Sequence, residues 1–198
     1  MAILDTRDSG LVYAAGDVLV YSAAEGHTSP TGFEDLTAPW LCMGWIDTTG
    51  VTFKLTEALK DVNAAGTLEA IRTLVTGAPK TFDATFVEGL NPVVRAAYDD
   101  VPITDLQPTT GVAVYTLPEI PTPQRRAYIF DTFDGDKRLR SYIPSGQVTT
   151  RGNDQQQQAD ATQLALTFTA YPAVIGSVRS AVKRYINFGS EDVSIFFA

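Results

Sequence analysis

Residues 44–98 decide the fold, and they read GWIDTTGVTFKL (44–55), TLEAIRTLVTGAPKTFDATFVE (67–88) and NPVVRAAY (91–98). Over 81–88, one set of alternate positions holds Thr, Asp, Thr and Val, and the other holds Phe, Ala, Phe and Glu. This is the period of a strand with two different faces. Gly50 separates the short runs 45–47 and 51–55 and predicts a turn between them. The Gly-Ala-Pro sequence at 77–79 breaks the next pair of runs, so the stretch predicts paired short strands.

The end of this stretch predicts one short helix. Asn91 is a residue type that often caps helix N-termini, and Pro92 then falls at the first helical position, where its missing N–H is harmless. The apolar residues that follow lie at i, i+1, i+4 and i+5 and give the helix one apolar side: Val93, Val94, Ala97 and Tyr98.

This order of motifs resembles the major tail tube protein of long, non-contractile bacteriophage tails of the siphophage type, in the branch found in phages of actinobacteria. The motifs that carry the resemblance are Gly44-Trp45, Gly50, Arg72-Thr73-Leu74-Val75, 81–86 and 91–98. The resemblance covers about residues 16–172 because further motifs match on both sides: 16–20, 28–31 and Trp40 upstream, and 143–144, 147–149 and 164–172 downstream.

The fold expected from the residues is mainly β. Several short antiparallel strands at regular spacing, one short helix and no βαβ rhythm indicate a β-sandwich or flattened barrel. The resemblance implies the same architecture, with two sheets and one flanking helix. We expect one tail tube domain over 1–198, with an N-terminal arm at 1–16 and a C-terminal extension at 173–198.

The resemblance also implies a structural role in the virion and no enzymatic activity. In this family six subunits close a ring, and stacked rings form a hollow tube that conducts the genome into the host. The expected partners are other copies of the chain and the tape-measure, tail-terminator and tail-tip proteins. Double-stranded DNA would pass without specific binding, along the polar face of the inner sheet. The protein would be made in the bacterial cytoplasm and end in the phage tail.

Two other functions stay open from the sequence. The chain could be the inner tube subunit of a contractile tail or injection system, which uses a similar fold. It could also be an acidic β-sandwich that binds a sugar or a surface receptor, which would require exposed aromatic residues around a cleft.

Charge argues against a protein that grips phosphates, because 15 basic and 23 acidic residues give a net charge of −8. The resemblance favours an acidic inner wall that repels DNA at short range, although general solubility explains the charge equally well. Residues 1–53 contain seven acidic residues but only one basic residue, Arg7. Near the C-terminus three basic residues lie close together in the sequence: Arg179, Lys183 and Arg184. This uneven distribution of charge could align one ring on the next, or the charged residues could simply lie on solvated faces.

Targeting signals are not evident in the sequence. No apolar run approaches the roughly 20 residues of a membrane span. Residues 1–10 carry Asp5, Arg7 and Asp8 and do not resemble a secretory signal. Cys42 is the single cysteine, which agrees with a reducing cytoplasm, and we expect it to be a small buried hydrophobe.

Outside the central stretch the pattern predicts further elements. We expect strands at 11–14, 16–21, 112–117, 161–171 and 192–197, and a hairpin of 125–133 and 137–143 joined through Asp134-Gly135-Asp136. Loops are expected at 22–36 and 151–160, and the resemblance implies that 22–36 orders against neighbouring subunits. Residues 56–66 could form a helix, but the long hairpin loop that the resemblance implies is preferred. Residues 177–188 fit a helix or a strand.

Residues with reactive side chains do not form a recognisable site, so we predict no catalytic, cofactor-binding or metal site. His27 is the single histidine and lies in a predicted loop without a nucleophile motif nearby. The aspartates at 131, 134 and 136 lack the calcium-loop pattern and fit a hairpin turn better. The adjacent carboxylates of Asp99 and Asp100 usually point apart. Trp40 and Trp45 are expected to pack in a core or an interface.

Overall fold

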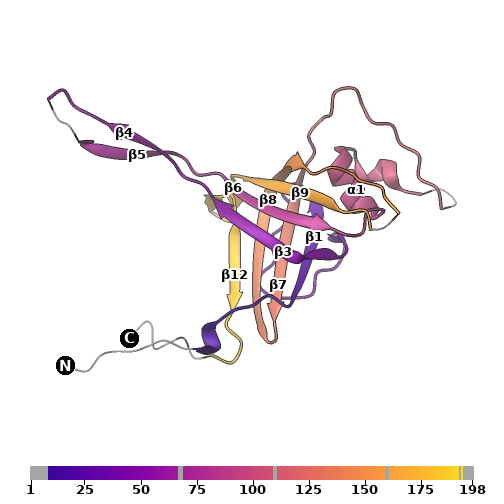
Figure 1. The fold of residues 1–198 in the computed structure, drawn as a ribbon. Coiled ribbons are helices and arrows are strands. Elements are labelled where there is room, and N and C mark those ends of the chain that lie inside the picture. Colours follow the sequence, from indigo (N-terminus) through magenta and orange to yellow (C-terminus); the bar gives the residue numbers. More distant parts are fainter. Residues whose placement is uncertain (1–8, 67–68, 109–110, 159–160, 192, 194–198) are drawn as a thin grey trace.

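The structure is a computed structural model that describes residues 9–66, 69–108, 111–158, 161–191 and 193 (Figure 1). Most strands join one large antiparallel sheet in the order β2-β1-β7-β8-β9-β6-β3, and β12 also pairs with β8. Two small two-stranded ladders, β4-β5 and β10-β11, lie outside it. The elements are η1 (Ser9–Leu11), β1 (Asp17–Ala24), β2 (Leu41–Cys42), β3 (Ile46–Leu55), β4 (Ala58–Val62), β5 (Arg72–Gly77), β6 (Lys80–Phe86), α1 (Pro92–Asp99), η2 (Ile103–Leu106), β7 (Arg125–Asp134), β8 (Lys137–Arg151), β9 (Leu164–Tyr171), β10 (Ala173–Ile175), β11 (Val178–Ser180) and β12 (Lys183–Asn187).

The 15-residue strand β8 belongs to both layers of the fold. Its first part pairs with β12, from Arg138 to Tyr142, and its last part pairs with β9, from Ser145 to Arg151. The sheet therefore folds over itself, and Figure 1 shows β3, β6 and β9 crossing in front of β7, β8 and β12. Its strand order begins at β2 and ends at β3, so the described residues form a sandwich and not a closed barrel.

The core fills the space between the two layers. Phe82 of β6 stacks on Phe130 of β7 with ring centroids 4.5 Å apart, and Tyr128 contacts Phe168 of β9 edge-on at 4.8 Å. Buried and half-buried residues alternate along β6 and β9, as the sequence period predicts. One face of each of these strands therefore lies in the core, and the other faces outward.

Helix α1 closes one end of the sandwich, and its N-terminus is as predicted. The Asn91 side chain accepts a hydrogen bond from the Val93 backbone N–H at 3.0 Å, and Pro92 is the first helical residue. The apolar side of α1, including Val94, joins the main core. The Arg151 Nε at the end of β8 donates to the Tyr98 carbonyl at 2.5 Å, which fastens the helix to the sheet.

Residues 25–40 form a loop that packs on the outer face of β1, β7 and β8. The Asp131 carboxylate is fully buried there, with the Arg140 guanidinium 2.7 Å away and that of Arg138 also bound. Arg140 Nη1 also donates to the carbonyls of Gly32 and Glu34 at 2.9 and 3.1 Å. The loop was expected to order against neighbouring subunits, but within one chain it already has partners on its own sheet.

Several predicted elements differ in the structure. The turn predicted at Gly50 is instead an irregularity within the continuous strand β3, where the register shifts between the pairs Ile46–Phe86 and Val51–Ala84. Gly50 has φ +68°, which explains why the position looked like a turn.

Other segments were assigned the wrong secondary structure. The strand predicted at 11–14 is wrong, because η1 ends at Leu11 and an irregular segment follows. The strand at 112–117 is also wrong, because beyond one bridge residue, Val112, the segment is irregular. Its Tyr115 side chain is half-buried against the cluster that includes Ala96 of α1. The helix alternative for 56–66 is wrong, since β4 pairs with β5 in a hairpin. The open choice at 177–188 resolves to strands β11 and β12. The strand predicted at 192–197 lies outside the described residues, except for Val193.

The remaining strands largely match the prediction. The hairpin of β7 and β8 turns through Gly135 and Asp136, and its second strand runs on to Arg151. The strand expected at 16–21 is β1, which continues to Ala24. Residues 152–158 form the predicted loop.

Candidate assembly surfaces

The outward face of β3, β6, β9 and the end of β8 is rich in threonine, and we call it the threonine face. It forms a hollow of about 470 Å³. The hydroxyls of Thr149 and Thr169 lie 2.8 Å apart on it, on paired strands. The members of the threonine face are Thr52, Lys54, Thr81, Asp83, Thr85, Thr149, Thr150, Ala165, Thr167 and Thr169.

Strand β3 ends the sheet order on this side. Its pairing partner in the sheet is β6, and none of the described strands pairs with its other edge, although the start of β1 lies near the first half of β3. Such an edge presents unpaired backbone N–H and C=O groups that can accept another strand. The threonine face is therefore bordered by a strand that another copy could extend.

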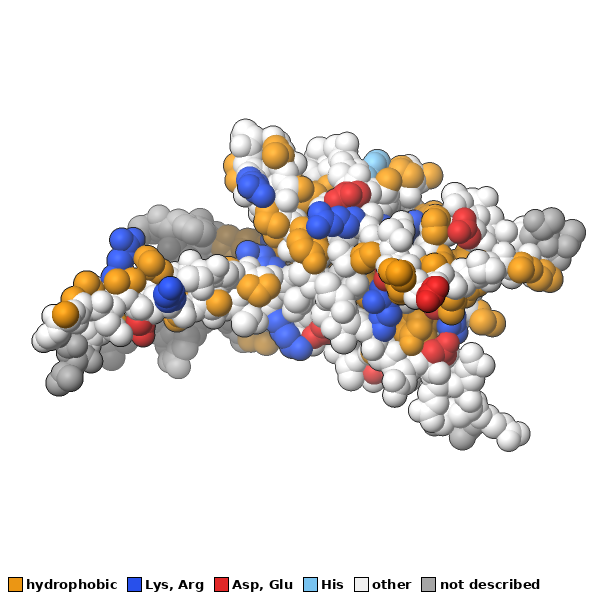
Figure 2. Space-filling model, turned by 90° about the horizontal axis from the view of Figure 1, so that it is seen from above, with side chains coloured by type: hydrophobic (Ala, Val, Ile, Leu, Met, Phe, Trp, Pro, Cys, Tyr) orange, Lys and Arg blue, Asp and Glu red, His pale blue; other side chains and the backbone are white. Residues whose placement is uncertain are grey.

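The β4-β5 hairpin projects from the body of the molecule (Figure 1). Leu59 and Val75 are directly opposite each other and are 60% and 61% exposed. Asp61 and Thr73 form a polar pair further along the hairpin, with a hydrogen bond of 2.6 Å. Figure 2 shows hydrophobic and charged side chains mixed along this arm. Exposed apolar side chains such as Leu59 and Val75 on a projecting hairpin are typical of a surface that contacts a partner.

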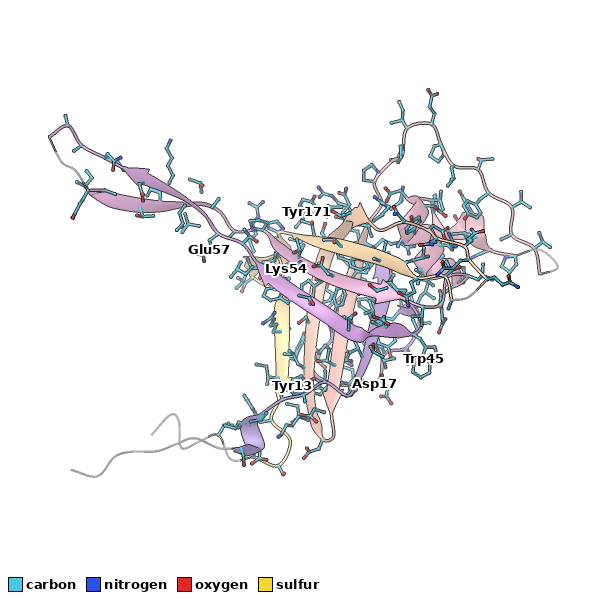
Figure 3. The ribbon with its side chains drawn as sticks, in the orientation of Figure 1. Tyr13, Asp17, Trp45, Lys54, Glu57 and Tyr171 are labelled. Atoms are coloured by element: carbon cyan, nitrogen blue, oxygen red, sulfur yellow. The ribbon has the colours of Figure 1, made fainter. Side chains whose placement is uncertain are left out.

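Trp45 is held on the surface by its neighbours. Gly44 has φ +81°, and a Cβ at this position would lie 2.3 Å from the Glu88 carboxylate. That carboxylate accepts the Trp45 backbone N–H at 2.9 Å and the Asn91 side-chain amide at 3.0 Å. The Trp45 side chain is 69% exposed and points away from the body in Figure 3. The prediction of core packing is therefore wrong for Trp45, and an interface role stays a prediction.

The connection between η2 and β7 exposes further apolar side chains. They belong to an irregular segment that emerges beside α1 in Figure 1. The exposed apolar residues of this segment are Val112, Val114, Leu117 and Ile120. The segment is therefore a further candidate contact surface.

The residues considered for chemistry lie apart and have structural contacts. His27 contacts the Trp40 ring edge-on at 5.1 Å. Trp40 packs against a second buried cluster, as predicted, whose members are Ala23, Ala127, Ile129 and Tyr142. Cys42 is exposed in the two-residue edge strand β2, so the prediction of a buried cysteine is wrong. Asp99 accepts the Tyr115 hydroxyl at 2.7 Å, whereas Asp100 pairs with Arg151 at 2.5 Å.

The three hairpin aspartates also bind different partners. Asp131 is paired with arginines, Asp134 accepts the Ala14 N–H at 2.9 Å, and Asp136 accepts the Ser190 N–H at 3.1 Å. In the described part of the chain, no group of three or more His, Cys, Asp or Glu is placed to hold a metal ion. None of the described helices is long and apolar enough to cross a membrane.

The buried pair of Asp131 and Arg140 was missed in the sequence, although a signal was present. The two-residue turn after Asp134 sets the register of β7 and β8, which places Asp131 opposite Arg140. Opposite charges at directly paired positions indicate an ion pair, but their burial depends on the distant 25–40 loop.

Comparisons with known proteins agree with this architecture. The family model described as phage tail tube protein matches residues 6–177. Comparison with curated proteins gives no match. The match extends beyond the sequence motifs on both sides and includes every element from η1 to β10, whereas β11 and β12 lie beyond it. The chain therefore belongs to the phage tail tube protein family, a family of structural proteins of the phage tail.

Proposed function

We propose that this chain is a major tail tube subunit of a long, non-contractile phage tail. Six copies close a ring, and rings stack into a hollow tube that conducts double-stranded DNA into the host. The chain acts as one tail tube domain over 1–198, with residues 1–16 and 173–198 as arms. It functions without enzymatic activity.

The threonine face carries this proposal. The layer β8-β9-β6-β3 has one face in the core and one hydroxyl-rich face, and it ends at β3, whose outer edge pairs with no strand among the described residues. Pairing of that edge with the next copy would join such layers into a continuous wall, with the threonine face on the inside. Repetition of one head-to-tail contact closes a ring when the rotation between copies divides a full turn.

The projecting hairpin supports stacking of the rings. Leu59 and Val75 would gain burial only in contact with another molecule. In the proposed tube the hairpin reaches the neighbouring ring, and permanent interfaces of this kind bury on the order of 2,000 Å² or more. The tape-measure, tail-terminator and tail-tip proteins would contact the inside and the ends of the tube.

Electron microscopy of the purified protein tests the proposal directly. Negatively stained samples should show hollow rods with a regular axial repeat, either after concentration or after addition of tail-tip proteins. A dispersed monomer under all of these conditions would overturn it. Six-fold symmetry in rod cross-sections would support the hexameric ring, and another symmetry would correct that number.

A further inference from the structure

Two basic side chains that line the hollow of the threonine face are each paired with a carboxylate. Lys54 Nζ lies 2.5 Å from Asp83 Oδ2, and Arg151 pairs with Asp100 at 2.5 Å. At the margin, the Arg125 guanidinium lies 4.4 Å from the centre of the Tyr171 ring. Lys54 and Tyr171 lie at the same end of this layer, close to the base of the hairpin (Figure 3).

The pair of Lys54 and Asp83 is exposed, which makes its role in stability small. The two side chains are 60% and 30% exposed, and ion pairs of this kind add little to folding. Asp83 is nevertheless well held, because it lies opposite Thr52 on β3 and Thr167 on β9. Burial raises the pKa of Asp83, but hydrogen bonds from Lys54 and Thr167 outweigh this effect, so the pKa lies below its ordinary value. The carboxylate therefore stays ionised at neutral pH.

A free lysine on this face would oppose the proposed conduit. Lysine binds phosphates as a point charge and releases their counterions, and this effect multiplies with the number of contacts. In a stack of rings the same lysine recurs in every subunit, so its contacts with one DNA molecule would add up. A carboxylate beside each lysine would cancel this attraction.

We propose that Asp83 masks Lys54 from passing DNA, so that the threonine face presents hydroxyl groups and compensated charges to the phosphates. The inference rests on the proposed function. It differs from the acidic wall that the resemblance favours, because the charged residues lining the hollow are Lys54, Asp83 and Arg151. Both basic residues are paired with a carboxylate, Lys54 with Asp83 and Arg151 with Asp100. Low friction then comes from the pairing of Lys54 with Asp83 and not from repulsion.

The test measures DNA retained inside assembled rods. Rods of wild type, Asp83→Asn, Asp83→Thr and the double variant Lys54→Gln/Asp83→Asn are mixed with a short fluorescent DNA duplex, treated with nuclease and pelleted. Asp83→Thr extends the threonine pattern of the face and provides a second variant if Asn disturbs the strand. Glu119→Gln removes the same charge from an exposed loop outside the face and serves as the matched control.

Both single variants at Asp83 should retain roughly tenfold more protected DNA than wild type at about 50 mM salt, and the excess should disappear by about 200 mM. The double variant and Glu119→Gln should behave as wild type. Equal retention by wild type and both Asp83 variants would overturn the inference, as would a double variant that retains as much as Asp83→Asn.

Whether rods form in wild type and in the Asp83 variants distinguishes a failure of this inference from a failure of the tube proposal. Absence of rods in every sample, wild type included, would reject the tube itself. Loss of rods in both Asp83 variants alone would show that Asp83 serves assembly and would overturn the masking role.

Discussion

Gly44 holds a position that no other residue type could occupy without strain. Its φ of +81° favours glycine, and the Glu88 carboxylate fills the space where a side chain would begin. The same carboxylate binds the Trp45 N–H and the Asn91 amide. Gly44 thus connects the start of β3 to the start of α1.

Substitution Gly44→Ala should lower the free energy of unfolding by about 2 to 3 kcal/mol, since it adds backbone strain and displaces the bonds of Glu88. Gly26→Ala is the matched control, because Gly26 has φ +72° and open space around it, and it should cost only about 1 kcal/mol. Urea unfolding of the monomer measures both values. Equal losses would contradict a specific role of the Gly44–Glu88 contact.

Arg140 is one of the residues that hold the 25–40 loop, and Arg138 and Tyr142 also donate to carbonyls of this loop. Arg140→Met leaves Asp131 buried with one guanidinium and removes two bonds to loop carbonyls, so we expect a loss of about 3 kcal/mol in unfolding free energy. Lys54→Met, which breaks an exposed pair, should cost less than about 1 kcal/mol. Limited proteolysis should cut the Arg140→Met variant within 25–40 first. Unchanged stability and cleavage would contradict the role of Arg140 in holding the loop.

The structural roles that the sequence predicts correctly are those set by neighbouring residues in the chain. Asn91 and Pro92 form a recognisable start of α1 because capping involves neighbouring residues only. Exposure of Cys42 and burial of Arg140 depend on which distant segment covers each strand, and composition carries no such information. The threonine face itself was predictable in part, since it follows from the alternation along 81–88 and 161–171.

At the scale of elements, β4 and β5 pair only with each other among the described strands, and their hairpin projects from the body. A double variant, Leu59→Ser/Val75→Ser, should leave the unfolding free energy nearly unchanged because both side chains are exposed. It should strongly reduce rod formation, measured by sedimentation and microscopy, since the contact with the next ring loses its apolar part.

The control for the hairpin variant lies on the same element. Asp61→Ser/Thr73→Ser replaces the neighbouring polar pair and should leave rod formation close to wild type. Normal rods from the apolar double variant would show that this pair does not contribute to stacking.

Elements were predictable where pairing is local. The β7-β8 hairpin, β6 and α1 follow from a turn signal, an alternating pattern and a cap. The bulge in β3 resembles a turn in the sequence because glycine is common in both, and only pairing with β6 distinguishes them. Residues 112–117 have a strand-like composition, but the described structure places no strand beside them to form a ladder.

At the scale of the whole molecule, a net charge of −8 on every subunit should oppose assembly. Raising the salt concentration from about 0.01 to 0.1 M shortens the range of this repulsion from about 30 to 10 Å, so rods should become more abundant. Sedimentation of rods across this range measures the effect. Fewer rods at higher salt would mean that ion pairs between subunits outweigh the repulsion.

The sharing of β8 between the two layers has a mechanical consequence. A pull on the hairpin enters β3 and β6, crosses to β9 through backbone hydrogen bonds, and reaches β8. From there it continues into the other layer along covalent bonds. The two layers cannot be pulled apart without breaking or unfolding β8, because this one strand belongs to both. A tube of such subunits would resist stretching because the load between the two layers is carried by the covalent backbone of β8, and not only by packing contacts between the layers.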